Sequence, residues 1–316
     1  MIATEIIRRR NELTAFLRRF FSDRGFLEIE TPLLVEKTVP EGSIRLFRTE
    51  SDDGFGGRQP LFLIPSPEVT MKKVLAAKPG LSIFQIGKSF RNGEVKTGIH
   101  SREFTMLEYY LRNADCFQTL DLTETLFAEL PFGPQPVRRP FLKLTVDELF
   151  GTFLGTPLSI LAVDNEDETR RRLAEFCRKL GLKADERKDS AADLFHLLFV
   201  DRIEPQLPKD RPVAVIGYPS FVPTTAALQS DRRFSQRWEL YFNGCELCNC
   251  YTEETDVSRL RSVLKNEAAV QGAPADEEFI EACGRLGLCS GNALGVDRLL
   301  MILLEKNNIE EILIPC

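Results

Sequence analysis

The segment WELYFNGCELCNCY constrains the fold most strongly, because it contains a turn that joins two strands in only one way. Asn-Gly is the favoured pair for a two-residue type I′ turn, so Asn243 and Gly244 predict an antiparallel hairpin. Side chains on a strand alternate between its two faces. With a two-residue turn, Glu239 and Glu246 are therefore expected on the same face of the hairpin, as diagonal neighbours.

Two carboxylates in this arrangement repel each other unless a cation neutralises them. Glutamate oxygens, together with water and phosphate oxygens, are ligands that Mg²⁺ prefers. The hairpin therefore predicts that Glu239 and Glu246 bind Mg²⁺. The alternative is an exposed face on which both carboxylates are hydrated, and the aromatic and apolar residues around them count against it.

The same hairpin contains three cysteines, which raises the question of a zinc site. Regular alternation from the turn places Glu239 opposite Cys248 and puts Cys245 on the opposite face from Cys248 and Cys250. No fourth Cys or His lies nearby to complete a tetrahedron. The pattern therefore predicts small buried thiols and no metal site.

The rest of the chain mixes strand-like and helix-like patterns. Apolar residues at helical spacing predict an N-terminal helix with its stop signal at Gly25, and Pro67 is expected to begin a second helix. Residues 117–205 are predicted to be mainly helical. Strands are expected at 26–31, 61–65, 83–90, 103–112 and 212–219, with a Gly-rich strand entering a helix over 289–306. Mainly antiparallel strands framed by helices define an α+β fold.

The loop between the strands at 83–90 and 103–112 carries a group of cationic side chains. Arg91, Lys96, His100 and Arg102 extend from a polar segment between two apolar strands that return to a common core. A cationic loop over a sheet is suited to hold a polyanion such as a triphosphate, and a solvated hairpin tip is the alternative. Arg298 begins the last helix, where the N-terminal amides also favour a phosphate.

Composition excludes several classes of protein. The 316 residues include 41 basic and 47 acidic side chains, a net charge of −6, which argues against wrapping a nucleic-acid backbone. No segment approaches the roughly 18 uninterrupted apolar residues of a membrane helix, and the N-terminus does not resemble a signal peptide. The 8 cysteines are scattered through the chain, so we expect reduced thiols and a cytoplasmic protein.

Three segments, in order, resemble motifs 1, 2 and 3 of the class II aminoacyl-tRNA synthetases: FLEIETPLL, FQIGKSFRNGEVKTGIHSREFTMLEYY and GNALGVDRLLM. The SPE and ELCNCYTE segments resemble the lysine-type subclass. The resemblance implies one catalytic domain over 1–316 with a central antiparallel sheet, and a homodimer that associates through motif 1. Its parts would be motif 1 at about 20–34, motif 2 at about 83–110, a helical insertion at about 117–205 and motif 3 at about 289–304.

Because Pro32 of motif 1 lies so near the start, we expect no anticodon-binding domain. The chain is most similar to truncated paralogues of the lysyl enzymes, which implies a protein acceptor and makes binding to tRNA or a membrane unexpected. The resemblance implies ATP-dependent activation of a lysine-type amino acid, in particular (R)-β-lysine, and transfer to a lysine side chain of elongation factor P. Ala293 stands where the synthetases usually have Gly at the floor of the amino-acid pocket.

The resemblance also implies roles for individual residues. Arg91 and Arg298 would be catalytic, with Arg91 on the α-phosphate and Arg298 on the γ-phosphate of ATP, and ATP and Mg²⁺ would be the cofactors. The implied ATP contacts are Arg91, Glu94, His100, Phe104, Glu239, Glu246 and Arg298, with Glu239 and Glu246 as metal ligands. The implied amino-acid pocket consists of Ser66, Glu68, Glu108, Tyr110, Asn249, Tyr251, Glu253 and Ala293.

Some positions depart from the family pattern. Motif 2 is one residue longer than the family pattern at Gly93, which favours an insertion that bulges at this glycine and returns Glu94 to the adenine edge. In the alternative alignment Gly93 replaces the family's Glu, and Glu94 points to solvent. Asn249 would point away from Glu246 in a regular strand, so a β-bulge is required between them. Two other functions stay open: an adenylating paralogue that acts on tRNA or a small acceptor, and a non-catalytic regulator. Retention of the whole ATP site argues against the regulator.

Overall fold

The computed structural model describes residues 4–42, 44–93, 98–271 and 276–314. In this part of the chain, eight strands form one mixed sheet: β1 (Leu27–Glu28), β5 (Ile83–Phe90), β6 (Glu103–Arg112), β11 (Cys289–Gly295), β10 (Cys245–Thr252), β9 (Arg237–Phe242), β8 (Val213–Ile216) and β7 (Leu142–Thr145), in that order across the sheet. The two edge pairs, β1 with β5 and β7 with β8, are parallel, and the inner pairs are antiparallel. The α+β fold class predicted from sequence is confirmed.

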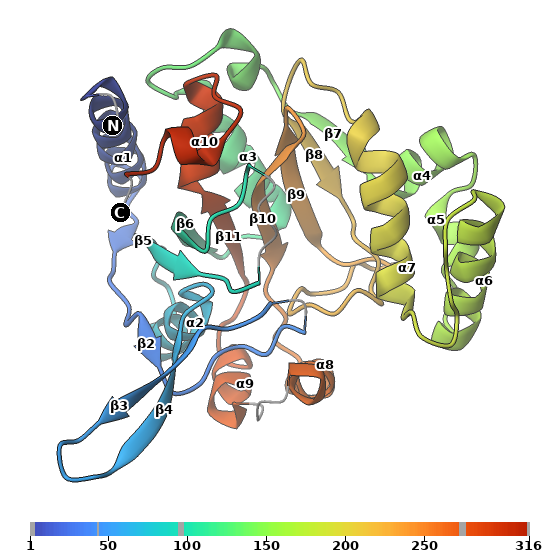
Figure 1. Ribbon diagram of the computed structural model, residues 1–316, viewed down its shortest axis with the longest axis horizontal. Helices are drawn as coiled ribbons and strands as arrows, with labels where there is room; N and C mark the ends of the chain where they lie inside the picture. Colours follow the sequence, from blue (N-terminus) through green and yellow to red (C-terminus); the bar gives the residue numbers. More distant parts are fainter. Residues whose placement is uncertain (1–3, 43, 94–97, 272–275, 315–316) are drawn as a thin grey trace.

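A smaller sheet extends from the body of the molecule. It consists of β2 (Leu34–Val35), β4 (Arg58–Leu63) and β3 (Arg48–Asp52), and the β3–β4 hairpin projects away from the rest of the chain (Figure 1). The buried strand predicted at 61–65 forms only over 61–63, where β4 is half-buried, and the buried residues Ile64 and Pro65 follow its end. The strand expected at 26–31 pairs only over Leu27–Glu28.

Helices cover both faces of the large sheet. They are α1 (Thr4–Ser22), α2 (Glu68–Ala77), α3 (Cys116–Ala128), α4 (Val146–Leu154), α5 (Leu158–Leu161), α6 (Glu166–Lys179), α7 (Ala191–Leu198), α8 (Val257–Gln271), α9 (Glu277–Cys283) and α10 (Val296–Leu303). Short turns of 3-10 or π-helix lie at Gln135–Arg138, Phe199–Ile203, Glu204–Gln206 and Ile309–Glu311. None of the helices in the described residues has both the length and the apolar character needed to cross a membrane.

Each face of the large sheet has a different character. On one face, side chains such as Leu107, Tyr109 and Trp238 pack with α1, α3 and α10 in the main apolar core. On the other face, Tyr110 packs with residues of α2, α8 and α9 in a smaller apolar cluster. The polar side chains of the candidate site lie on this second face, bordered by those three helices.

The N-terminal helix packs against its own chain. An aromatic-rich face on this helix would support a homodimer if it were exposed, but Phe16, Phe20 and Phe21 are buried in the main core. Phe21 stacks on Phe84 of β5 with 5.2 Å between the ring centroids. The homodimer therefore loses this support, although it stays a prediction.

Residues 117–205 are mainly helical, as predicted, with α3 to α7 in this range, but they include one strand that the pattern did not predict. β7 pairs in parallel with β8 and extends the sheet (Figure 1). Capping boxes begin α3, α4 and α7, which fixes where these helices start. The helices α4 to α7 pack around a core of their own together with residues of β8.

The turn of the central hairpin has the predicted conformation. Asn243 has φ +52° and Gly244 has φ +73°, the two positive values that a type I′ turn requires. Tyr241 pairs with Glu246 as expected. The chain then departs from regular alternation, because the register shifts between Glu246 and Cys248.

This bulge changes which residues face one another. Asn249 lies opposite Glu239, where regular alternation placed Cys248. The bulge required between Glu246 and Asn249 is therefore present. The argument that Cys245 faces away from Cys248 is wrong, because the bulge returns both thiols to the apolar core.

Candidate active site

Four neighbouring strands contribute one polar row across the second face of the sheet. Glu108 of β6 lies opposite Ala293 of β11, Ala293 opposite Asn249 of β10, and Asn249 opposite Glu239 of β9. Residues two positions further along a strand share the same face, which adds Tyr110 and Tyr251 to this row. The site residues on these strands are thus brought together by the sheet register.

A buried lysine lies among the acidic residues of this face. Lys72 Nζ lies 2.5 Å from Glu68 Oε1 and 2.5 Å from Glu253 Oε2, and its side chain has no exposed surface. Burial alone would lower the pKa of Lys72, but Glu253 and Glu68 raise it well above its usual value. Lys72 is therefore a cation that neutralises part of the acidic pocket.

Two carboxylates of the pocket retain free acceptor capacity. Glu108 Oε1 accepts a hydrogen bond of 2.8 Å from the Tyr110 hydroxyl, while its Oε2 is buried without a hydrogen-bond partner. Glu253 Oε1 is also buried without one. Burial raises the pKa of Glu108 to about 8, with a further contribution from Glu68, and burial raises the pKa of Glu253 to about 8 against the opposing effect of Lys72. A ligand ammonium would satisfy both orphaned oxygens.

Glu68 is held by a hydroxyl network at the start of α2. Tyr251 donates to Glu68 Oε1 at 3.0 Å, and the Thr225 hydroxyl lies 3.3 Å from the same oxygen. On β11, the pocket leaves no room for a side chain at Gly291. A Cβ there would lie 2.5 Å from a ring carbon of Tyr110 and 2.7 Å from Glu253 Oε1. Gly291 therefore allows Tyr110 and Glu253 to approach the sheet.

Beside the acidic pocket lies a cavity of about 130 Å³. It combines most of the residues expected to contact ATP with residues of the pocket floor. Its lining includes Arg91, His100, Phe104, Glu246, Asn249, Ala293 and Arg298. The Arg91 guanidinium lies 5.4 Å from the centre of the Phe104 ring, which leaves an aromatic face and a cation side by side.

Arg298 is fixed at the wall of this cavity. It donates from Nη1 to the backbone oxygen of Glu246 at 2.9 Å and from Nε to the backbone oxygen of Ile99 at 3.2 Å. The Glu246 carboxylate lies 3.9 Å away. These bonds join the start of α10 to the bulge of β10 and to the loop after β5, so three elements position one guanidinium.

The two candidate metal ligands differ in how much acceptor capacity they retain. Glu239 Oε2 accepts from Tyr218 at 2.5 Å and from Tyr241 at 2.6 Å, and its Oε1 is paired with Arg237 at 2.5 Å. Burial and the nearby Glu239 carboxylate raise the pKa of Glu246 to about 7, as expected for a carboxylate that lacks a full counter-charge.

The pair of carboxylates fits Mg²⁺ only if other oxygens complete the shell. No group of three or more His, Cys, Asp or Glu side chains is arranged to hold a metal ion within the residues described. Glu246 carries the free oxygens, and Glu239 has one lone pair left on Oε1 once its three partners are counted. We therefore expect Glu246 to be the principal ligand, with phosphate oxygens completing the shell.

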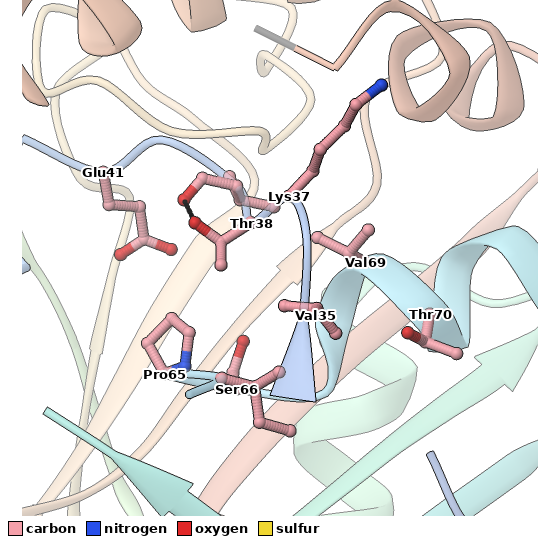
Figure 2. Close-up of a pocket in the computed structure, with 10 residues that line it drawn as sticks. Val35, Lys37, Thr38, Glu41, Pro65, Ser66, Val69 and Thr70 are labelled. Atoms are coloured by element: carbon pink, nitrogen blue, oxygen red, sulfur yellow. Dashed lines mark hydrogen bonds between the residues drawn. The ribbon is translucent and has the colours of Figure 1, made fainter. Parts of the chain in front are cut away.

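Other predicted site residues lie elsewhere or outside the described ranges. Ser66 lines a separate small cavity with Glu41 and Val69 (Figure 2). Gly93 has φ +74°, so the motif 2 loop does turn at this residue. Glu94, whose side chain was expected at the adenine edge, lies outside the described residues.

Sequence reasoning missed two charged side chains of the site, Lys72 and Arg237. Lys72 follows Glu68 by four residues, a spacing that could have indicated an ion pair on one helix face. Arg237 alternates with Glu239 on β9 and also donates from Nε to Asn249 Oδ1 at 3.2 Å.

The described fold and site define a synthetase-type nucleotide-dependent enzyme core, with two arginines beside an acidic pocket. A comparison with protein families agrees: residues 2–314 match the model of the tRNA synthetases class II (D, K and N). The chain therefore belongs to the class II tRNA synthetase family.

Within this family, the chain is similar to several curated proteins that share one name. The chain is 34% identical over 317 residues to elongation factor P–(R)-β-lysine ligase of Haemophilus ducreyi, an alignment that covers 96% of this chain and 91% of that protein. The ligase of the same name from Pectobacterium atrosepticum is 33% identical, with 96% and 93% covered. That from Avibacterium paragallinarum is 35% identical, with 96% and 92% covered.

Proposed function

We propose that this chain activates a lysine-type amino acid with ATP, in particular (R)-β-lysine, and transfers it to a lysine side chain of elongation factor P. The observation that carries the proposal is an acidic pocket with orphaned oxygens on Glu108 and Glu253, directly beside a cavity that contains Arg91 and Arg298. The acidic pocket is suited to a diamino acid, and the cavity with the two arginines is suited to a triphosphate. The names of the relatives supply the acceptor.

In the first step, a carboxylate oxygen of the amino acid attacks the α-phosphorus of ATP in line, and pyrophosphate leaves with the electron pair of the broken bond. Arg91 orients the carboxylate and α-phosphate, and Arg298 neutralises charge on the departing pyrophosphate. Phe104 provides a surface on which adenine stacks. In the second step, the lysine ε-amine of the acceptor attacks the acyl carbon and AMP leaves.

Mg²⁺ is proposed as the cofactor of this reaction, held by Glu246 and, through its remaining lone pair, by Glu239. When bound, it would neutralise phosphate charge and orient the triphosphate. Its proposed site lies where the Glu246 carboxylate and Arg298 share the wall of the cavity.

We further propose a homodimer that associates through motif 1. In that region Leu27, Leu33 and Leu34 are 53%, 39% and 49% exposed, more apolar surface than isolated side chains usually present together. Analytical ultracentrifugation tests this: we expect a dimer for the unmodified chain and a shift to monomer for Leu34→Glu. A monomer at all micromolar concentrations would contradict the proposal.

We propose a cytoplasmic protein whose acceptor is a protein and not tRNA. The acceptor and ATP are both cytoplasmic, and the net charge of −6 offers little attraction to a nucleic-acid backbone. These statements depend on the proposed reaction.

The experiment that tests the function measures ATP–pyrophosphate exchange with α-lysine and with both enantiomers of β-lysine, followed by transfer to elongation factor P or to tRNA. We expect exchange that depends on the amino acid and transfer to the protein. Arg298→Ala should reduce exchange by about 10²–10³-fold, while Arg187→Ala, at an exposed residue of the insertion, should not change it. No exchange with any lysine isomer would reject the enzyme, and charging of tRNA would reject the acceptor.

A further inference from the structure

Arg237 of β9 contacts a residue that lines the cavity, although it is not part of the lining itself. Its Nε donates to Asn249 Oδ1 at 3.2 Å, and its Nη2 donates to Glu239 Oε1 at 2.5 Å. Asn249 lies on the wall of the cavity, together with Arg91 and Ala293. Arg237 therefore reaches the cavity through the side chain of Asn249.

The β-bulge of β10 brings these two side chains together. Regular alternation along the strand would place Asn249 on the face opposite to Glu246. In the structure the register shifts between Glu246 and Cys248, so that Asn249 pairs with Glu239. Arg237 lies two positions before Glu239 on β9 and shares its face. The bulge thus places the Asn249 amide on the same face as the Arg237 guanidinium.

Three contacts fix the Arg237 guanidinium. Besides its hydrogen bonds to Asn249 and Glu239, its Cζ lies 4.6 Å from the centre of the Tyr218 ring. Glu239 is itself held by the hydroxyls of Tyr218 at 2.5 Å and Tyr241 at 2.6 Å. The Arg237 side chain is only 12% exposed, so water competes little for these contacts. Asn249 is therefore bonded to a rigid and permanently charged donor.

This guanidinium also fixes the orientation of the Asn249 amide. A side-chain amide has an acceptor oxygen and a donor NH₂ group, whereas a guanidinium has only donors. Oδ1 therefore faces Arg237, because the reverse orientation would place donor against donor. Among the residues that the structure describes, Nδ2 of Asn249 donates to no other group. Its N–H groups are available to a ligand in the cavity.

The donors around this cavity match the carboxylate of an amino acid. Arg91 Nε is buried without a hydrogen-bond partner in the described part of the chain, and Arg91 lines the same cavity as Asn249. The orphaned oxygens of Glu108 and Glu253, in contrast, are acceptors suited to an ammonium. Ala293 lies between Asn249 and Glu108 across the strands. A diamino acid with its ammonium in the acidic pocket would thus direct its carboxylate toward Asn249.

We propose that Arg237 is a positioning residue that holds Asn249 Oδ1, so that Asn249 Nδ2 donates to the reacting carboxylate. This inference rests on the proposed function, because it names a residue that orients the substrate of the same reaction. Arg237 itself does not touch the substrate. A lysine in its place would keep a positive charge beside Glu239, but a single ammonium lacks the planar fork that reaches both Glu239 and Asn249.

A double-mutant cycle with Arg237→Lys and Asn249→Ala tests the proposal. Calorimetry gives dissociation constants of α-lysine and (R)-β-lysine for the unmodified chain, both single variants and the double variant. Each single variant should weaken binding by about 5–50-fold, because a hydrogen bond to the carboxylate is lost or misdirected. In the Asn249→Ala background, Arg237→Lys should cost less than about twofold, since its effect passes through Asn249. Arg237→Gln replaces Arg237→Lys in the cycle if that variant does not fold.

The matched control is Arg171→Lys. Arg171 also donates from Nε and Nη2, to the two carboxylate oxygens of Glu168, but it lies on the surface of α6. This variant should leave the affinity for both lysine isomers unchanged.

Asn249→Asp tests which group of the substrate Asn249 contacts. An aspartate keeps an acceptor for Arg237 but presents an oxygen to the cavity in place of the N–H groups. It should therefore bind lysine more weakly than Asn249→Ala does, because two carboxylates would face each other. A residue that contacted an ammonium would give the opposite order.

The outcomes separate this inference from the proposed function. If the unmodified chain binds neither lysine isomer, the proposed function fails and the inference fails with it. If the chain binds either isomer, additive losses in the cycle, or tighter binding by Asn249→Asp than by Asn249→Ala, overturn the inference while the proposed function stands. Circular dichroism of each variant checks that the fold is retained.

Discussion

Lys72 Nζ lies 2.5 Å from Glu253 Oε2, although the two residues are 181 positions apart in the sequence and neither side chain is more than 1% exposed. The ion pair joins α2 to the residue that follows β10, across the acidic pocket. A buried pair contributes little net stability when it is intact, but loss of one partner leaves an uncompensated charge in the interior. Lys72 therefore supports the pocket and at the same time limits how much positive charge a ligand has to supply.

Replacement of Lys72 by Met should destabilise the protein by about 3–5 kcal/mol, because Glu68 and Glu253 lose their shared cation. The measurement is urea denaturation of the ligand-free protein at pH 7. Lys179→Met is the matched control, since Lys179 also pairs with a glutamate four residues earlier, Glu175, but on the surface. The control should change the free energy of unfolding by no more than about 0.5 kcal/mol. Equal effects in the two variants would contradict the structural role of Lys72.

Stability should fall as the pH rises from 6 to 8.5. The pKa of Glu108 is raised by burial to about 8, whereas glutamates in the unfolded chain titrate near 4.5. Between these values the folded state holds more protons than the unfolded state, so the slope of unfolding free energy against pH is negative. This stabilising contribution is complete below pH 4.5 and is lost as the pH passes through 8.

Scanning calorimetry of the ligand-free protein checks the sign of this slope. Glu108→Gln removes this titrating group, so the melting temperature of the variant should depend less on pH over the same range. Glu168→Gln is a suitable control, because Glu168 is a surface carboxylate that pairs with Arg171 and Arg172 and has a lowered pKa. A melting temperature that rises between pH 6 and 8.5 would be incompatible with protonated carboxyls in the pocket.

Gly291→Ala should abolish the amino-acid pocket without a change in the sheet topology. The new methyl group would meet Tyr110 at 2.5 Å and Glu253 at 2.7 Å, so at least one of these side chains must move. We expect binding of lysine to weaken at least about tenfold, as measured by calorimetry. Gly151→Ala provides a control, since a Cβ there would only touch Pro157 at an ordinary 3.5 Å. Unchanged affinity in Gly291→Ala would show that Tyr110 and Glu253 do not contact the substrate.

The two candidate metal ligands should differ in their effect on Mg²⁺ dependence. Glu239 is already held by Arg237 and two tyrosine hydroxyls, whereas Glu246 faces the cavity beside Arg298. Glu246→Gln should therefore raise the Mg²⁺ concentration needed for half-maximal exchange more than Glu239→Gln does. A titration of exchange activity with Mg²⁺ measures this. The opposite order, or exchange that needs no metal, would contradict the assignment.

Local patterns predicted those parts of the fold that depend on neighbouring residues. The Asn243-Gly244 turn has the expected positive φ values, because only a few residue pairs adopt a type I′ turn without strain. The paired strands of motif 2 and the shared face of Glu108 and Tyr110 follow from simple alternation, and the structure has both.

Features that depend on distant contacts could not be predicted in this way. The bulge after Glu246 breaks alternation, so the prediction that Cys245 faces away from Cys248 was wrong. The pairing of Lys72 with Glu253 requires β10 and α2 to meet in space.

Ala293 occupies the junction between the acidic pocket and the cavity with Arg91, because it lies opposite Glu108 on one side and Asn249 on the other. Its methyl group therefore borders the place where the reacting carboxylate would lie. Misplacement of a reacting group by about 1 Å can cost about 100-fold in rate. Ala293→Gly should thus shift preference toward α-lysine, whose amino group lies one carbon closer to the carboxylate.

The quantity to measure is the ratio of kcat/KM for α-lysine to that for β-lysine in the exchange reaction. Glycine within a strand also costs about 0.5–1 kcal/mol of stability, but the ratio compares two substrates on the same folded protein and is unaffected by that loss. We expect the ratio to rise at least severalfold in Ala293→Gly. An equal change in both kcat/KM values would mean that the methyl group supports the strand and takes no part in the choice between the two substrates.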